Sequence, residues 1–132
     1  MSDRKNTNHF IEPTRSELEI LQVLWQNGPS TVREVNDKLN EQKREVAYTS
    51  TLKLMQIMVD KGILKRDESS MKHVYESILE EKKAKGFLLD RFVDSMYQGS
   101  ASSLILQLLG NKKASKKELD TIKEMLKKFD NK

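Results

Sequence analysis

The 132-residue sequence has no cysteine, only two prolines and only five glycines. Without cysteine the chain cannot form a disulfide framework, present a thiol nucleophile or bind a metal through thiolates. Long apolar runs are also missing. None approaches the roughly 20 residues that a membrane-spanning helix needs, and the polar residues 1–9 contain no apolar signal-peptide core. We therefore expect a cytoplasmic protein with no stable membrane association.

Side chains that carry catalysis or bind metals are scarce as well. The two histidines, His9 and His73, lie far apart in the sequence, and neither has a carboxylate or a second histidine at ligand spacing. The chain also contains no glycine-rich phosphate loop and no set of acid, base and nucleophile that would converge on a substrate. We expect no enzymatic activity, no metal site and no cofactor.

The charge of the chain is unevenly distributed, although its formal net value is only +4. Basic residues outnumber acidic ones in residues 42–73 and 100–132, whereas acidic residues are in excess in residues 1–41. A basic segment suits contact with nucleic acid, and it is equally typical of an ordinary solvated surface. Charge alone leaves both interpretations open.

Three sequences of the form S/T-x-x-E predict the starts of helices, because the hydroxyl and the carboxylate satisfy amides that have no partner within the helix. The pairs are Thr14 with Glu17, Thr31 with Glu34, and Ser115 with Glu118. Apolar residues at helical spacing follow each start. The same spacing predicts three more helices, over residues 48–59 with Gly62 as the cap, residues 80–98 and residues 100–109.

Between the third and fourth of these helices the pattern changes to one of β-strands. Residues 63–66 and 71–78 flank the polar turn at residues 67–70, which predicts a β-hairpin. Three helices followed by a hairpin is the order of a winged helix, in which the third helix enters the major groove and the wing contacts the neighbouring backbone. We expect a mainly α fold: a winged helix-turn-helix with a small β-hairpin wing, followed by a C-terminal helical dimerisation module. The expected domains are a flexible N-terminal arm at residues 1–12, the DNA-binding domain at residues 13–79 and the dimerisation domain at residues 80–132.

The outward side chains of the third helix and the wing are the ones that we expect to contact DNA. The third helix uses Leu52, Met55, Met58 and Val59 on its inward face, so small hydroxyls and a lysine remain on the outer face. Such side chains can approach base edges and phosphates without steric clash. The candidates are Thr49, Ser50, Lys53 and Gln56 on the helix, Arg44 before it, and Lys65, Arg66, Lys72 and His73 on or near the wing. The alternative is a solvated surface, and Asp67 and Glu68 count against a strongly cationic wing tip.

The C-terminal helices carry more apolar side chains than they can bury alone, and we expect these side chains to form a homodimer interface. The residues concerned are Leu88, Phe92, Met96, Leu104, Ile105, Leu108, Leu109, Ile122 and Leu126. A two-fold dimer would place two reading helices on successive major grooves, about 34 Å apart. The alternative is that the same residues pack onto the N-terminal domain.

Several short segments of the chain resemble those of a known family in order and spacing. They are residues 13–21 with Leu24 and Trp25, residues 46–52, residues 61–66, residues 73–75 and residues 103–106. Together they extend over about residues 10–129, and they resemble the penicillinase-repressor family, the BlaI/MecI/CopY group of transcriptional regulators. The resemblance implies a dimeric winged-helix repressor that binds double-stranded operator DNA at a palindrome. It places Tyr48, Thr49, Ser50 and Lys53 at the groove and residues 104–109 at the dimer interface.

The resemblance also implies how such a repressor is released, and here the chain departs from the family pattern. The copper-responsive branch senses metal through C-terminal cysteines, which this chain lacks. The antibiotic-responsive branch is released by proteolysis linked to a membrane-bound sensor metalloprotease, which cuts an Asn-Phe bond. The matching pair in this chain is Gln107 and Leu108, and Ile57 stands where many members have an arginine. The inducing signal stays open.

Two other functions remain compatible with the residues. One is a small-molecule-responsive winged-helix regulator with an effector pocket between the two halves, for which the C-terminal half offers the polar residues Ser95, Tyr97 and Gln107. The other is a winged-helix protein–protein adaptor, which would favour neutral outward positions on the third helix. Lys53 and Arg44 argue against the adaptor.

Overall fold

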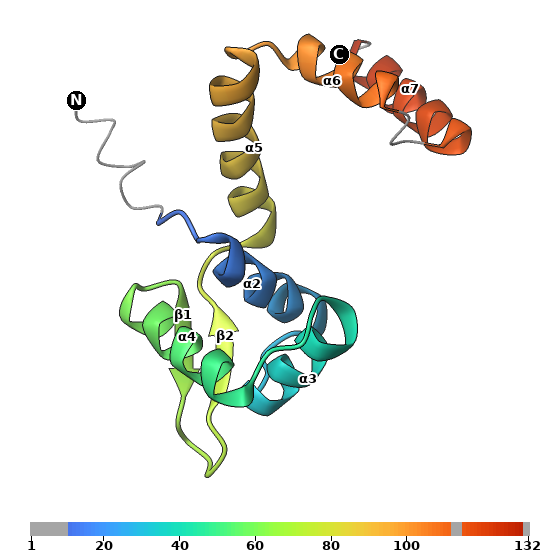
Figure 1. Ribbon diagram of the computed structural model, residues 1–132. Helices are drawn as coiled ribbons and strands as arrows, with labels where there is room; N and C mark the ends of the chain where they lie inside the picture. The colour runs from blue at the N-terminus through green and yellow to red at the C-terminus, as the bar shows by residue number, and fades with distance from the viewer. Residues whose placement is uncertain (1–10, 112–114, 131–132) are drawn as a thin grey trace, which may run out of the picture. The chain divides into compact units, whose positions relative to one another are not determined.

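The computed structural model describes residues 11–111 and 115–130 (Figure 1). The helices are α2 (Arg15–Asn27), α3 (Val32–Gln42), α4 (Tyr48–Asp60), α5 (Glu81–Tyr97), α6 (Ala101–Gly110) and α7 (Lys116–Asp130), and the strands are β1 (Leu64–Asp67) and β2 (Val74–Ser77). This order of three helices, a hairpin and three further helices confirms the predicted mainly α fold with a two-stranded wing. Residues 1–10 of the predicted arm lie outside the described residues.

The described chain divides into two compact units after Lys85, within α5 and slightly later than the predicted boundary at residues 79 and 80. The first turns of α5 belong to the first unit because Ala84 is fully buried and the Lys85 ammonium lies 5.9 Å from the centre of the Trp25 ring. The Trp25 indole also donates a hydrogen bond to the carbonyl of Leu79 at 3.0 Å. Among the described residues, no helix combines the length and the apolar character needed to cross a membrane.

The starts of α2 and α3 follow from their capping boxes. Thr14 accepts a hydrogen bond from the amide of Glu17, whose carboxylate accepts one from the amide of Thr14 in return. Thr31 and Glu34 repeat the arrangement at the start of α3. Each box satisfies two amides that the helix itself leaves unpaired. The two local predictions are confirmed.

The core of the first unit lies between α2, α3, α4 and the hairpin. Its fully buried side chains include Leu21, Val35, Met55, Met58 and Ile63. The hairpin is attached to the α2–α3 connection as well, because the amide and carbonyl of Ser30 bond to the carbonyl and amide of Tyr75 at 3.0 and 2.8 Å. The wing therefore has a fixed position beside the start of α3.

An ion pair between a buried carboxylate and a half-buried lysine connects the start of α2 to the end of α4. The Glu17 side chain is 2% exposed, and both of its oxygens accept from the Lys61 ammonium, at 2.9 and 2.8 Å. A carboxylate that leaves water needs such a partner. Gly62 follows with φ of +82°, in the left-handed region where glycine is favoured after a helix. The end of α4 is thus fixed in place.

The predicted second wing strand was too long. Residues 71–73 lie in the connection rather than in β2, which begins at Val74. The Asp67 carboxylate accepts from the amide of Ser69, and the Ser70 hydroxyl donates to the carbonyl of Lys72. These hydrogen bonds hold the tip in a longer turn than the one at residues 67–70 that β-propensity predicts.

Candidate nucleic-acid interface

The outer face of α4 is accessible. Thr49, Ser50, Lys53 and Gln56 are exposed, whereas Met55 and Met58 are fully buried on the opposite face. Thr51 is also buried, at 1% exposure, although the apolar pattern gave no sign of it. The first unit therefore presents two hydroxyls, an amide and a lysine on one edge of a single helix. We call Thr49, Ser50 and Lys53 the reading edge.

The N-terminus of α4 has no side-chain cap. Its N-cap is Ala47, which makes no side-chain hydrogen bond to the first turn. No side-chain oxygen at the N-cap therefore offsets the positive end of the helix dipole. A phosphate oxygen would be favourable at such a position. Next to the reading edge, this geometry suits a DNA backbone.

A hollow of about 540 Å³ lies between the start of α3, the start of α4 and the wing. Its lining includes Arg33, Tyr48, Lys72 and His73. The Arg33 guanidinium stacks 4.3 Å from the centre of the Tyr48 ring, a cation–π contact that orients both side chains. Arg33 was missed in the sequence. It lies 15 residues before Tyr48, and only the packing of α3 against α4 brings the two together.

The wing contributes fewer free cations than the sequence indicated. Lys65 lies 3.7 Å from Glu76 on the paired strand, and Arg66 pairs with Glu68 at 2.6 Å. Hydrogen bonds with Tyr75 and with Glu68 raise the pKa of Arg66 above its ordinary value. Hydrogen bonding from Ser69 lowers the pKa of Asp67, so the tip keeps a negative charge at neutral pH. Among the predicted wing contacts, Lys72 and His73 are the exposed side chains that line the hollow.

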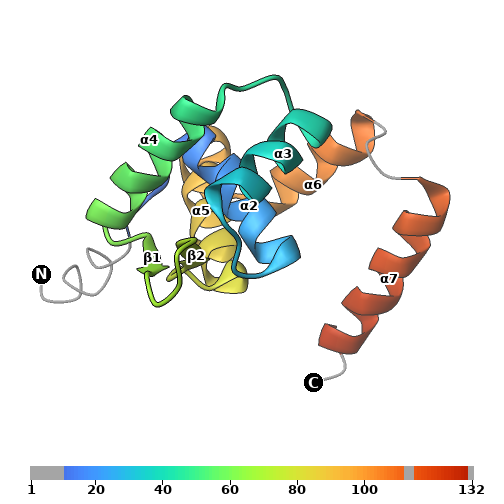
Figure 2. The same ribbon diagram turned by 90° about the horizontal axis from the view of Figure 1, so that it is seen from below.

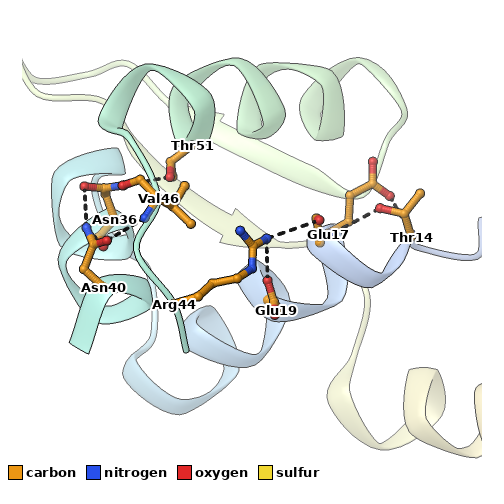
Figure 3. A network of polar contacts seen from close by, with 9 residues as sticks. Thr14, Glu17, Glu19, Asn36, Asn40, Arg44, Val46 and Thr51 are labelled. Atoms are coloured by element: carbon orange, nitrogen blue, oxygen red, sulfur yellow. Dashed lines mark hydrogen bonds and ion pairs between the residues drawn. The ribbon is translucent and has the colours of Figure 1, made fainter. Parts of the chain in front are cut away.

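A second basic surface lies on the other side of α4. Arg44 donates to Glu19 at 3.1 Å and to Ser16 at 3.5 Å, so the structure holds its guanidinium against α2 (Figure 3). Arg15 and Lys43 line the same hollow of about 480 Å³. A neighbouring hollow runs from Arg44 to Ser50. Arg15 and Lys43 were missed in the sequence, because residues from α2 and from the α3–α4 connection meet only in the folded unit.

The second unit leaves most of its apolar side chains exposed. Phe92, Met96, Ile105, Leu108, Leu109 and Ile122 are between 44% and 62% exposed, and Leu88 and Leu104 are half-buried. No residue of α6 is buried. The side chain of Leu126 lies outside the described residues. Exposed apolar surface of this extent is typical of an interaction site. Gln107 and Leu108 are both exposed on α6, and the Gln107 amide donates to Asn111 at 3.2 Å.

The described residues contain no group of three or more histidine, aspartate or glutamate side chains that could hold a metal ion.

The structure defines the positions of the predicted DNA contacts, which lie on α4, on the α3–α4 connection and on the wing. Their contact with DNA stays a prediction, as does the assignment of the apolar residues to a dimer interface.

Comparison with known proteins agrees with this architecture. The family model described as "Penicillinase repressor" matches residues 13–128. Among curated proteins, the penicillinase repressor of Staphylococcus aureus is 24% identical over 119 residues, covering 90% of this chain and 94% of that protein. The methicillin resistance regulatory protein MecI of Staphylococcus aureus (strain N315) is 22% identical over 121 residues, covering 92% and 98%. The penicillinase repressor of Bacillus licheniformis is 23% identical over 116 residues, covering 88% and 90%.

Among solved structures, a MarR family protein from Bacillus stearothermophilus matches with a TM-score of 0.50 and 19% identity, covering 97% of this chain and 79% of that one. At this identity the likeness concerns the fold alone. It agrees with a winged helix followed by further helices.

Proposed function

We propose, from the premise that this chain belongs to the penicillinase-repressor family of transcriptional repressors, that it binds a palindromic operator as a homodimer. Family membership makes the chain a DNA-binding transcriptional regulator rather than an enzyme. The dimer, the palindrome and the mode of release are our proposal.

The observation that carries the proposal is the reading edge with cations on both sides of it. Arg33 and Lys72 lie on one side of α4, and Arg15, Lys43 and the Glu19-paired Arg44 lie on the other, where the hollow beside Arg44 reaches Ser50. In the major groove a helix is flanked by two phosphate backbones, so cations on both sides are what such a helix requires. The hydroxyls of Thr49 and Ser50 would then meet base edges, while the lysine and the flanking cations would meet phosphates.

The exposed apolar surface of the second unit supports a homodimer. A second copy of the same surface would cover it in a two-fold arrangement, in which each subunit offers the same patch to the other. Two copies of α4 would then stand about one helical turn of DNA apart, roughly 34 Å. A palindromic operator follows from that symmetry.

We further propose that an upstream signal ends repression, and that proteolysis by a membrane-bound sensor metalloprotease would act on α6. A cut between Gln107 and Leu108 would divide the apolar residues of this helix and so weaken the dimer. Incubation of the chain with such a protease, followed by mass spectrometry of the products, tests this. An intact chain would rule out this mode of release.

The salt dependence of binding tests the proposed function. We expect log affinity to fall linearly with log salt concentration, with a slope of roughly −5 to −7, if each subunit neutralises about three to four phosphates. The measurement is fluorescence anisotropy, with a duplex that the wild-type chain has enriched from a pool of random sequence. Enrichment of no duplex, or a flat dependence on salt, would contradict operator binding.

A further inference from the structure

We propose that Asn36 and Asn40, two side chains of α3, are positioning residues that fix where the reading helix α4 begins and how it is rotated. The inference rests on the proposed function, because it concerns the accuracy with which α4 reads DNA. It assigns DNA discrimination to two residues that lie outside the reading edge.

The start of α4 has little restraint of its own. The connection from Gln42 to Tyr48 contains the exposed residues Lys43, Arg44 and Glu45, and it forms an arc at the periphery of the first unit (Figure 2). The N-cap residue Ala47 makes no side-chain hydrogen bond to the first turn. Capping side chains normally define where a helix begins. In α4 that restraint has to come from elsewhere.

Asn36 supplies it from the buried side of α3. Its side chain is 4% exposed. Its amide group donates one hydrogen bond to the carbonyl of Val46 at 3.0 Å and another to the hydroxyl of Thr51 at 2.8 Å (Figure 3). Val46 lies two residues before α4, and Thr51 lies on its buried face. One amide group therefore joins the connection and the helix to α3.

Asn40, one turn further along α3, binds the same segment of backbone. Its carbonyl oxygen accepts from the amide of Val46 at 2.7 Å, and its amide group donates to Asn36 at 3.0 and 3.1 Å. Both backbone polar groups of Val46 are thus bonded by side chains of α3. We call Asn36, Asn40 and Thr51 the asparagine clamp. It fixes the backbone at Val46, two residues before Tyr48. Through Thr51 it also fixes how the first turn of α4 is rotated about the helix axis.

The clamp affects reading more than folding, because the rest of α4 has other anchors. Met55 and Met58 are fully buried in the core, and Lys61 is paired with Glu17. Loosening the clamp would therefore displace the first turn, which carries Thr49 and Ser50. Hydrogen bonds to base edges weaken steeply with small changes in distance and angle. Phosphate contacts of flexible lysines and arginines tolerate such a displacement, and they carry no sequence information.

The test uses two variants that open the clamp and two that leave it closed. Asn40→Ala removes the acceptor for Val46 at an exposed position, and Thr51→Val removes the hydroxyl while keeping the shape of the side chain. Thr51→Ser keeps the hydroxyl. Asn27→Ala is a matched control, since it removes an asparagine amide that donates to the carbonyl of Val23 on α2.

The measured quantity is the ratio of affinities for the duplex enriched by the wild-type chain and for a duplex of the same composition in shuffled order. We expect Asn40→Ala and Thr51→Val to lower this ratio about tenfold, with the affinity for the shuffled duplex nearly unchanged. The melting temperature should be nearly unchanged in Asn40→Ala and lower in Thr51→Val, which leaves a buried N–H of Asn36 without its acceptor. Thr51→Ser and Asn27→Ala should keep the wild-type ratio.

An unchanged ratio in both clamp variants would overturn the inference and leave the proposed function intact. A parallel loss of affinity for both duplexes would also overturn it, because that result indicates a purely structural role. If the wild-type chain itself did not discriminate between the duplexes, the proposed function would fail, and this inference with it.

Discussion

Replacing Ile105 with aspartate is expected to split the proposed homodimer and to abolish tight operator binding at low protein concentration. Ile105 is 46% exposed on α6, a helix with no buried residue, so the substitution should leave each subunit folded. Burial of an aliphatic side chain contributes about 1.5–3 kcal/mol, and a two-fold interface contains the residue twice. We therefore expect the dimer dissociation constant to rise by about 100-fold or more.

Sedimentation equilibrium measures this change directly, and Leu106→Asp provides the matched control. Leu106 is on the same helix and is 68% exposed, and it borders Leu109 but lies about 100° around the helix axis from Ile105 and about 160° from Leu108. The control should remain dimeric. Equal dissociation of both variants would show that the interface is not confined to the Ile105 side of α6, and a dimer unaffected by either would remove α6 from the interface.

The second large effect concerns the reading edge. Replacing Ser50 and Lys53 separately by alanine should weaken binding in two different ways. Loss of a base-edge contact typically costs about 1–3 kcal/mol, and the dimer loses two copies, so Ser50→Ala should lower the affinity for the enriched duplex by about 30-fold or more. The affinity for shuffled DNA should hardly change. Lys53→Ala should weaken binding to both duplexes alike and make the salt slope shallower by about 1 per subunit.

Anisotropy titrations of the two duplexes across salt concentrations separate these outcomes. Lys83→Ala is the control for the loss of one lysine, because Lys83 is 84% exposed and lies outside the proposed interface. If Lys83→Ala and Lys53→Ala had the same effect, only overall charge would matter. If neither Ser50→Ala nor Lys53→Ala changed binding, an adaptor function without DNA would be the better account.

The elements that the sequence predicted well are those defined by neighbouring residues. Each capping box is contained within four residues, and the helices after Thr14 and Thr31 begin where those boxes place them. The inward face of α4 could be predicted for a similar reason, since Met55 and Met58 repeat at helical spacing. The wing strand was predicted too long because β-propensity in residues 71–73 competes with side-chain bonds in the turn.

The contacts that were missed join residues far apart in the chain. Glu17 has the sequence signature of a capping residue, and nothing near it indicates Lys61, its ion-pair partner 44 residues later. Asn36 looks like an ordinary polar residue on a helix, yet it is buried because α3 packs against the start of α4. Arg33 and Tyr48 meet for the same reason. Helical periodicity defines which face of each element is apolar, but not which polar side chains will meet across two elements.

The most direct test of the account is methylation interference on the duplex that the wild-type chain enriches. Methyl groups on guanine N7 obstruct the major groove, where two copies of the same short helix are proposed to lie. The expected result is two clusters of interfering guanines, with centres about 10 base pairs, or a whole multiple of that spacing, apart. A single cluster, or tight binding that no methylated guanine impairs, would contradict it.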